Sequence, residues 1–214
     1  MKQYPISRDG WSYLWVLAVL TILAYWLRSW LALLPGILFF LILFFFRNPE
    51  REIPEGEGTL LSPADGVVLD VERVFEERFF KGESIRIRIY LSQFNVNVNR
   101  TPMRGKVVYR AYREGKMLPI FKNHTSERNE KNYLGIQNEY VRILVTQVNG
   151  FMTRRIVCWV KDGDQVERGE RFGLIKFGSC TEIFLPPDVE VTVSPRDKVR
   201  GGETIIGRVK IDER

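Results

Sequence analysis

The chain has 214 residues, 45% of them hydrophobic, and its 32 Lys and Arg against 26 Asp and Glu give a formal net charge of +6. This length suits one domain with a proper core plus an appendage, and the modest positive excess fits an anionic membrane surface but is too small to indicate a nucleic-acid partner. The two cysteines, Cys158 and Cys180, and one histidine exclude a disulfide framework and a structural zinc site, so no metal is expected.

The first 47 residues are apolar. Two uncharged runs, 11–27 and 29–46, are separated only by Arg28, and each is at the short end of what spans a bilayer as a helix. Pro35 is expected to break or kink the second run early. We therefore expect either two transmembrane helices or a helical hairpin embedded in one leaflet. Basic residues at both ends of the apolar segment place the remaining chain on the cytoplasmic face of the cell membrane.

Residues 48–58 form a polar linker rich in Pro, Gly and Glu, and residues 59–214 have the composition of a β-rich domain. Apolar and basic residues alternate along "SIRIRIYL", which predicts a half-buried strand. The predicted strands cover residues 84–91, 140–148 and 154–160. The segment 122–132 has no periodicity and is predicted to be a loop, with room for one helical turn.

Two segments 33 residues apart resemble each other. "DQVERGERFG" begins at Asp164 and "DKVRGGETII" begins at Asp197, and both fit the pattern D-x-V-x-x-G-E. This pattern is typical of hairpins in lipoyl- and biotinyl-type β structures. The predicted fold is therefore mainly β with lipoyl-like hairpins around the segment between them, preceded by an N-terminal hydrophobic helical hairpin.

That intervening segment contains "FGSCTEIFLP", residues 177–186. A Gly-Ser pair alone indicates a turn. The same pair also permits chemistry, because the Ser179 hydroxyl can attack the Gly178 carbonyl and convert the amide to an ester. Elimination and hydrolysis then leave a pyruvoyl group at position 179, which can form a Schiff base with an amine substrate and act as an electron sink. Gly178 suits this reaction because it tolerates a strained backbone.

The chain also resembles a known family through several motifs in order, listed here as they stand: "SPADG" (62–66), "NVNVNRTPMRGKV" (95–107), "SERNE" (126–130) and "RRIVCWVKDGDQVERGERFGLIKFGS" (154–179). With "FGSCTEIFLP" these are similar to the phosphatidylserine decarboxylase family, in its small membrane-bound branch that includes archaetidylserine decarboxylases. The resemblance covers essentially the whole chain, including its apolar start.

The resemblance implies self-cleavage between Gly178 and Ser179. The products would be a β chain, 1–178, and an α chain, 179–214, that remain associated. The implied cofactor is the pyruvoyl group generated from Ser179. The implied reaction converts a phosphatidylserine-type phospholipid in the bilayer to the phosphatidylethanolamine-type lipid and CO2. Archaetidylserine is an alternative substrate, and a homo-oligomer is left open.

Three further residues are candidates for acid–base roles. Asp65 in "SPADG" matches the family's acidic residue that assists self-processing, although a turn explains Asp-Gly equally. The family's usual N-V-H-V-N-R is "NVNVNR" here, so Asn97 occupies the position of a histidine implicated in catalysis. Asn can hydrogen-bond but cannot take a proton at neutral pH. The single histidine, His124, is therefore a candidate replacement, with Asp65 assisting Ser179 alone as the other possibility.

The departure at Asn97 also keeps a rival interpretation open, a processing-dead, membrane-bound lipid-binding homologue. A second set of residues carries two interpretations as well, either a solvated strand face or contacts to phosphate and lipid headgroups. This basic set is Arg86, Arg88, Arg100, Arg104, Lys106 and Arg110.

Overall fold

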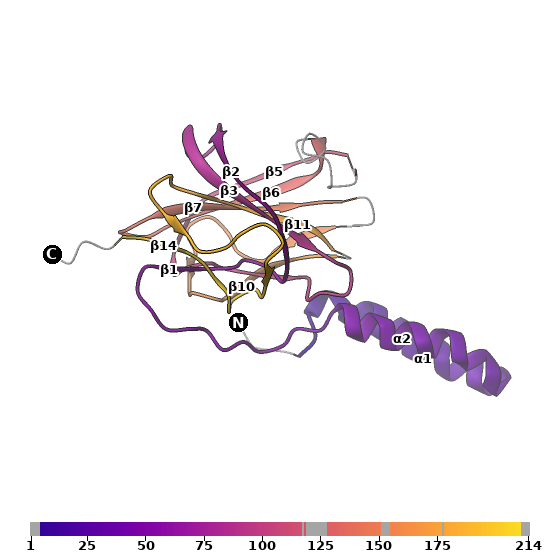
Figure 1. Cartoon of the computed structure of the whole chain (residues 1–214). Helices are drawn as coiled ribbons and strands as arrows, with labels where there is room; N and C mark the ends of the chain where they lie inside the picture. Colours follow the sequence, from indigo (N-terminus) through magenta and orange to yellow (C-terminus); the bar gives the residue numbers. More distant parts are fainter. Residues whose placement is uncertain (1–4, 117, 119–127, 151–154, 177, 211–214) are drawn as a thin grey trace. The chain divides into compact units, whose positions relative to one another are not determined.

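The structure is a computed structural model that describes residues 5–116, 118, 128–150, 155–176 and 178–210. The chain divides into two compact units, Met1–Glu50 and Arg51–Arg214. The first unit is helical and the second is built from antiparallel strands (Figure 1). The mainly β fold with an apolar helical start is confirmed.

The two apolar runs of the first unit form helices. Its elements are η1 (Arg8–Gly10), α1 (Trp11–Leu27), η2 (Ser29–Ala32) and α2 (Leu33–Phe45), where η marks a short 3₁₀ turn. Pro35 does not break α2 but lies in its first turn, where the missing N–H needs no partner within the helix. The second run is instead interrupted by η2, so α2 begins four residues after the run does.

Both ends of the first unit meet. The Ser7 amide donates to the Phe46 carbonyl at 2.9 Å, and the Asn48 amide donates to the Pro5 carbonyl at 2.8 Å. Tyr13 also stacks on Phe46 with ring centroids 5.8 Å apart. The two helices therefore form the expected hairpin, with its entry and exit on the same side.

The hairpin exposes a large apolar surface, which includes Trp15, Trp26 and Phe40. Arg8–Leu27 is a helix long and apolar enough to cross a bilayer, whereas Ser29–Phe45 is a shorter apolar segment.

The described residues of the second unit form three sheets. Its strands are β1 (Thr59–Leu61), β2 (Gly66–Glu76), β3 (Gly82–Leu91), β4 (Val98–Arg100), β5 (Gly105–Arg113), β6 (Lys131–Gln137), β7 (Arg142–Val148), β8 (Ile156–Cys158), β9 (Gln165–Val166), β10 (Arg171–Ile175), β11 (Ser179–Leu185), β12 (Glu190–Val191), β13 (Lys198–Val199) and β14 (Ile205–Arg208). The large sheet has the order β13-β2-β3-β11-β7-β6-β5-β9. Two three-stranded sheets have the orders β1-β14-β12 and β4-β10-β8.

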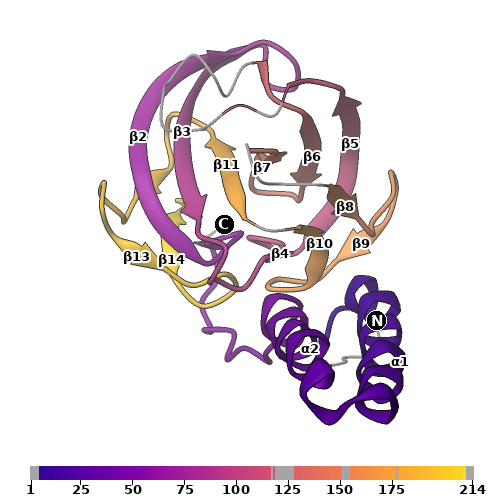
Figure 2. The same ribbon diagram turned by 90° about the vertical axis from the view of Figure 1, so that its right-hand side faces the viewer.

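The large sheet curls, with β2 and β5 at opposite sides (Figure 2). Its inner face shares one buried apolar cluster with residues from both small sheets, because Leu60 of β1, Phe172 of β10 and Ile206 of β14 join it. The small sheets therefore cover one face of the large sheet.

The alternation along β3 produces the predicted two-faced strand. Ile87 and Ile89 are buried in the main cluster, while Arg86 and Arg88 lie on the opposite face. Arg86 and Arg88 are paired on this face, since Arg86 lies 2.7 Å from Glu72 and Arg88 binds Asp70, both on the neighbouring β2. The basic set is therefore divided: these two members are paired, Arg100 is buried elsewhere, and Arg104, Lys106 and Arg110 are exposed.

The two similar segments differ from the expected hairpins. β9 pairs with β5, while β10, which follows it, pairs with β4 and β8. Likewise, β13 pairs with β2, while β14 pairs with β1 and β12. The repeated Asp and Gly residues specify similar turns, but the strands that leave each turn enter different sheets.

The other predicted strands form with shifted ends. The segment 140–148 becomes β7, which starts two residues later, and 154–160 contains β8. The predicted loop 122–132 ends too late, because Lys131 and Asn132 already belong to β6. Residues 122–127 of that segment lie outside the described part of the chain.

A buried ion pair joins strands that are not neighbours. Lys131 Nζ of β6 lies 2.8 Å from Glu182 Oε2 of β11, across the intervening β7, and the Glu182 side chain is fully buried. A buried charge is stable only when it is paired, so this contact should be sensitive to the loss of either partner.

We predict that Glu182→Gln lowers the free energy of unfolding by about 3–5 kcal/mol, because it leaves the Lys131 ammonium without its counter-ion. The double variant Lys131→Met, Glu182→Leu should recover most of this loss. Urea unfolding of the detergent-solubilised protein provides the measurement. Arg104→Ala, which removes an exposed pair with Glu167, is the control and should change stability little. Equal losses in the single and double variants would contradict the prediction.

Candidate active site

Ser179 is the first residue of β11, and its position is set by pairing on both sides of that strand. It lies opposite Leu91 of β3, and the next residue, Cys180, lies opposite Tyr90 of β3 and Val148 of β7. Ser179 is only 5% exposed, and its hydroxyl has no hydrogen-bond partner among the residues that the structure describes. A buried hydroxyl without a partner is uncommon in folded proteins and requires an explanation.

Gly178, directly before Ser179, has a φ of +80°, in the left-handed region that favours glycine. A Cβ atom built at this position would lie 2.6 Å from the Leu91 carbonyl oxygen and 3.1 Å from the Gln93 nitrogen. Both the conformation and the close approach of β3 therefore require glycine. The scissile bond predicted from the sequence thus lies in a constrained backbone segment.

Asn97 is 1% exposed, and both polar atoms of its side chain lack a partner within the described part of the chain. The Ile175 amide donates a hydrogen bond to the Asn97 carbonyl at 3.1 Å, so the last residue of β10 lies beside Asn97. Four residues after Ile175, Ser179 begins β11. Further along, Asn99 Nδ2 donates to Thr181 Oγ1 at 2.9 Å. These contacts place Asn97 at the end of β11 where Ser179 lies.

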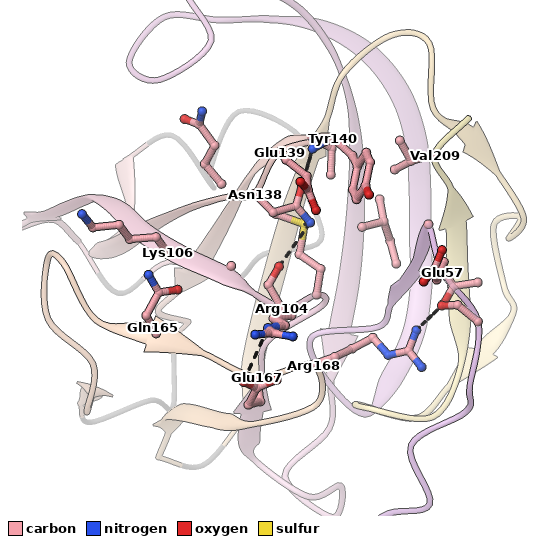
Figure 3. Close-up of a pocket in the computed structure, with 18 of the residues that line it drawn as sticks. Glu57, Arg104, Lys106, Asn138, Glu139, Tyr140, Gln165, Glu167, Arg168 and Val209 are labelled. Atoms are coloured by element: carbon pink, nitrogen blue, oxygen red, sulfur yellow. Dashed lines mark hydrogen bonds and ion pairs between the residues drawn. The ribbon is translucent and has the colours of Figure 1, made fainter. Parts of the chain in front are cut away.

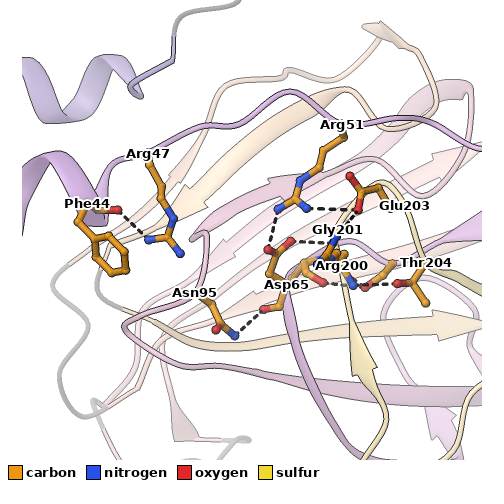
Figure 4. A network of polar contacts seen from close by, with 11 residues as sticks. Phe44, Arg47, Arg51, Asp65, Asn95, Arg200, Gly201, Glu203 and Thr204 are labelled. Carbon is orange, nitrogen blue, oxygen red and sulfur yellow. Dashed lines mark hydrogen bonds and ion pairs between the residues drawn. The ribbon is translucent and has the colours of Figure 1, made fainter.

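Asp65 has a different environment, shown in Figure 4. Its carboxylate accepts hydrogen bonds from Arg51 Nη2 at 2.7 Å and from the Gly201 amide at 2.8 Å. Its backbone carbonyl accepts a bond from Asn95 Nδ2 at 3.3 Å. Asp65 therefore ties the linker to the turn before β14, and the structure does not place it in contact with the Ser179 hydroxyl. Its part in self-processing stays a prediction.

His124 lies outside the described residues, so its predicted acid–base role stays a prediction as well. Arg100 is described and buried, and its Nη1 donates to the Gly169 carbonyl at 2.9 Å. Burial, together with the charges of Arg171 and Arg51, lowers the Arg100 pKa to about 10. The guanidinium therefore stays charged at neutral pH.

Comparisons with known proteins show the family of this chain. A family model described as phosphatidylserine decarboxylase matches residues 38–207. A phosphatidylserine decarboxylase proenzyme of Carboxydothermus hydrogenoformans is 54% identical over 204 residues, which cover 95% of this chain and 96% of the relative. A proenzyme of the same name from Symbiobacterium thermophilum is 46% identical, over 98% of this chain and 98% of the relative. Another, from Syntrophus aciditrophicus, is 38% identical, over 94% of this chain and 96% of the relative.

The chain belongs to the phosphatidylserine decarboxylase family. It is therefore an enzyme of the carboxy-lyase class.

The decarboxylase has a polar network beside Ser179 that sequence reasoning missed. Gln147, opposite Thr181 in the sheet, donates to Asn99 Oδ1 at 2.8 Å and accepts from Asn132 Nδ2 at 2.9 Å. Asn149 follows two residues after Gln147, and its side-chain oxygen is buried without a partner. The only signal in the sequence is the polar interruption "TQVN" at the end of an apolar strand.

Cys180 of the decarboxylase is adjacent to Ser179 but lies on the other face of β11. It packs with Val148 and Tyr90, away from the main cluster. Burial, followed by the nearby Glu182 carboxylate, raises the pKa of the Cys180 thiol far above its ordinary value. The thiol is thus neutral at pH 7 and is not a competing nucleophile.

A cavity of about 780 Å³ lies beside the linker and the start of β5 (Figure 3). None of the predicted catalytic residues that the structure describes lines it, but Arg104 and Lys106 of the basic set do. Two of its guanidinium groups have protein partners, since Arg104 lies 3.7 Å from Glu167 and Arg168 donates to Thr59 Oγ1 at 2.7 Å. Four acidic side chains offset its three basic ones, so the cavity has no clear preference for an anion.

We predict that Gly178→Ala destabilises the decarboxylase more than Gly163→Ala. Gly163 has a similar φ of +89°, but a Cβ atom there would meet nothing within 4 Å. Both changes incur the cost of a left-handed alanine, about 1–2 kcal/mol, and only Gly178→Ala also forces β3 away. Urea unfolding of both variants in a Ser179→Ala background checks the difference. Equal destabilisation would show that the close approach to Leu91 is unimportant.

Proposed function

We propose that the chain is a self-processing, pyruvoyl-dependent decarboxylase that converts phosphatidylserine to phosphatidylethanolamine and CO2. The observation that carries the proposal is the Gly178-Ser179 pair: a buried hydroxyl without a partner, preceded by a glycine with positive φ, in a family whose relatives are named as proenzymes. The residues present fit the formation of a pyruvoyl group.

In the proposed processing, Ser179 Oγ attacks the Gly178 carbonyl carbon and its proton moves to the departing amide nitrogen. The C–N bond breaks and an ester forms. Loss of the Ser179 α-proton then breaks the Cβ–Oγ bond and leaves a carboxylate on Gly178. Hydrolysis of the remaining dehydroalanine releases ammonia and produces the pyruvoyl group. Gly178 supports this sequence because glycine adopts the positive φ without strain and, lacking a Cβ, permits close approach of the Ser179 hydroxyl to its carbonyl carbon.

The pyruvoyl group supplies a ketone that takes up the substrate amine and withdraws electrons from the bond to the departing carboxylate. The Asn97 amide can donate a hydrogen bond to that carboxylate and so orient it. Asn97 cannot supply the proton that replaces CO2. Asp65, His124 and water remain the candidates for that step.

The strand order supports two chains that stay together after cleavage. The proposed α chain, 179–214, begins with β11, which pairs along its length with β3 and β7 of the β chain. The same short chain contributes β13 to the large sheet and β14 to a small one. Separating the chains would therefore require unfolding the sheets.

We further propose that the hairpin of α1 and α2 anchors the enzyme in the cell membrane with the β unit in the cytoplasm. The exposed aromatic and aliphatic residues of both helices support this proposal, because so large an apolar surface needs a nonaqueous environment. Arg8 and Arg47 lie at the end where entry and exit meet, which the positive-inside rule assigns to the cytoplasm.

Asn97 favours one rival function, a lipid-binding homologue that is neither processed nor active. Both interpretations predict lipid binding, but only the enzyme cleaves itself and releases CO2. Archaetidylserine is the alternative substrate, and it differs in its lipid tails and not in the headgroup that meets Ser179.

We predict that the purified protein contains a 36-residue α chain, since 214 − 178 = 36, with a ketone-bearing N-terminus. Intact mass spectrometry after borohydride treatment with an added amine detects this group, and CO2 release is measured on phosphatidylserine and archaetidylserine. Ser179→Ala is the control and should remain one chain of 25.1 kDa without activity. An uncleaved wild-type chain that binds lipid but releases no CO2 would establish the rival function.

We also predict that deletion of residues 1–47 releases the enzyme from membranes without preventing cleavage. Turnover on bilayer substrate should fall at least tenfold more than turnover on detergent-dispersed lipid, because only the bilayer assay depends on anchoring. Flotation with vesicles, a gel of the processed chains and the two assays provide the measurements. An equal fall in both assays would show that the hairpin contributes to the active site itself.

A further inference from the structure

Asn149 lies beside Ser179, although the two residues are 30 positions apart. The antiparallel register pairs Cys180 with Val148, so the next position along each strand puts Ser179 opposite Asn149. The pairing of β7 with β6 also continues past Val148, since the Asn149 amide donates a hydrogen bond to the Glu130 carbonyl at 2.9 Å. Residues in such opposed positions have neighbouring side chains.

The side chain of Asn149 belongs to the same sheet face as Ser179. Side chains alternate along β7, and Val145 packs in the main cluster with Ile183 of β11. Val148 and Cys180 form a separate cluster on the opposite face. Asn149 therefore shares its face with Val145, and Ser179 shares its face with Ile183.

Hydrogen bonds fix which way the Asn149 amide points. Its Nδ2 donates to Glu130 Oε2, and Tyr112 donates its hydroxyl to Glu130 Oε1 at 2.7 Å. This bond, followed by burial, raises the Tyr112 pKa to about 12, so the phenol keeps its proton. A carboxylate with two donors around it only accepts hydrogen bonds. The NH2 of Asn149 must therefore face Glu130.

This orientation leaves Asn149 Oδ1 buried with no hydrogen-bond partner among the described residues. Two other such groups belong to the same end of β11, the Ser179 hydroxyl and the Asn97 amide. Buried polar atoms normally have partners, so three side chains without them at one end of β11 are groups that a polar ligand could satisfy. The acceptor on Asn149 is suited to an N–H group.

We propose that Asn149 Oδ1 accepts a hydrogen bond from the primary amine of the substrate headgroup and positions that amine at residue 179. This proposal rests on the proposed function. A neutral amide oxygen suits the task better than a carboxylate, because a carboxylate would favour the protonated ammonium, which is not a nucleophile. Asn149 is thus a specificity residue for an amine-bearing headgroup.

The test measures binding to the uncleaved Ser179→Ala chain, full length in detergent. The probes are glycerophosphoserine and the same molecule with 3-hydroxypropionate in place of serine, which lacks the amine. Calorimetry should show that the Ser179→Ala chain prefers the amine-bearing probe by about tenfold, and that adding Asn149→Leu removes this preference.

Thr146→Val is the matched control. Thr146 lies on the same strand, and its buried hydroxyl also lacks a partner, but it belongs to the opposite face. This variant should keep the tenfold preference. Glu130→Gln keeps the side-chain size and lets the Asn149 amide rotate, so it should reduce the preference partially and in the same direction. It also provides a test if Asn149→Leu does not fold.

An amine preference that is absent from the Ser179→Ala chain, or that survives both Asn149→Leu and Glu130→Gln, overturns the proposal. Either outcome is separate from a failure of the proposed function. That failure would appear as a wild-type chain without cleavage or CO2 release, and the binding experiment depends on neither.

Discussion

β11 lies between β3 and β7 and pairs with β3 from Ser179 opposite Leu91 to Leu185 opposite Ile85. Ser179 is the first residue of this strand. The residues that follow it pair regularly with β3, whereas Gly178, which precedes it, has a positive φ. The close contact between Gly178 and the Leu91 carbonyl then excludes any side chain there. The proposed cleavage site is thus a junction between a rigid strand and a constrained turn.

The two faces of β11 differ in how their buried polar groups are paired. On the face of Glu182, the buried charges are paired, with Lys131 bound to Glu182 and Arg88 bound to Asp70. On the face of Ser179, hydrogen bonds link Thr181 through Asn99 to Gln147, but the groups nearest Ser179 are left without partners. Pairing of the charges on the first face stabilises the sheet, while the polar atoms without partners near Ser179 are the ones that we propose to contact the substrate.

The membrane anchoring that we propose for this decarboxylase would suit its proposed phospholipid substrate. A phospholipid presents its headgroup at the membrane surface while its tails remain in the hydrocarbon. An apolar hairpin whose two ends meet on one side suits this task, since it needs only one attachment to the β unit. The polar chemistry and the apolar anchor are therefore built from separate stretches of the chain.

Several features could be predicted from the sequence because they depend on residues close together in the chain. The two apolar helices follow from uninterrupted apolar runs, β3 follows from its alternation, and the Gly178-Ser179 chemistry is contained in adjacent residues. Pro35 shows the limit of this reasoning, since a proline that disrupts a helix interior is harmless in the first turn.

Other features were decided only by the tertiary structure. Arg86 and Arg88 appeared to form a basic surface, but the pairing of β2 with β3 supplies carboxylates from residues more than a dozen positions away. Asp65 has the local sequence of a simple turn, and its carboxylate is bound by Arg51 and Gly201. Asn149 belongs to none of the sequence motifs identified above, and only the antiparallel register brings it opposite Ser179. Register depends on the packing of whole strands, so no local pattern in the sequence encodes which distant side chains will meet.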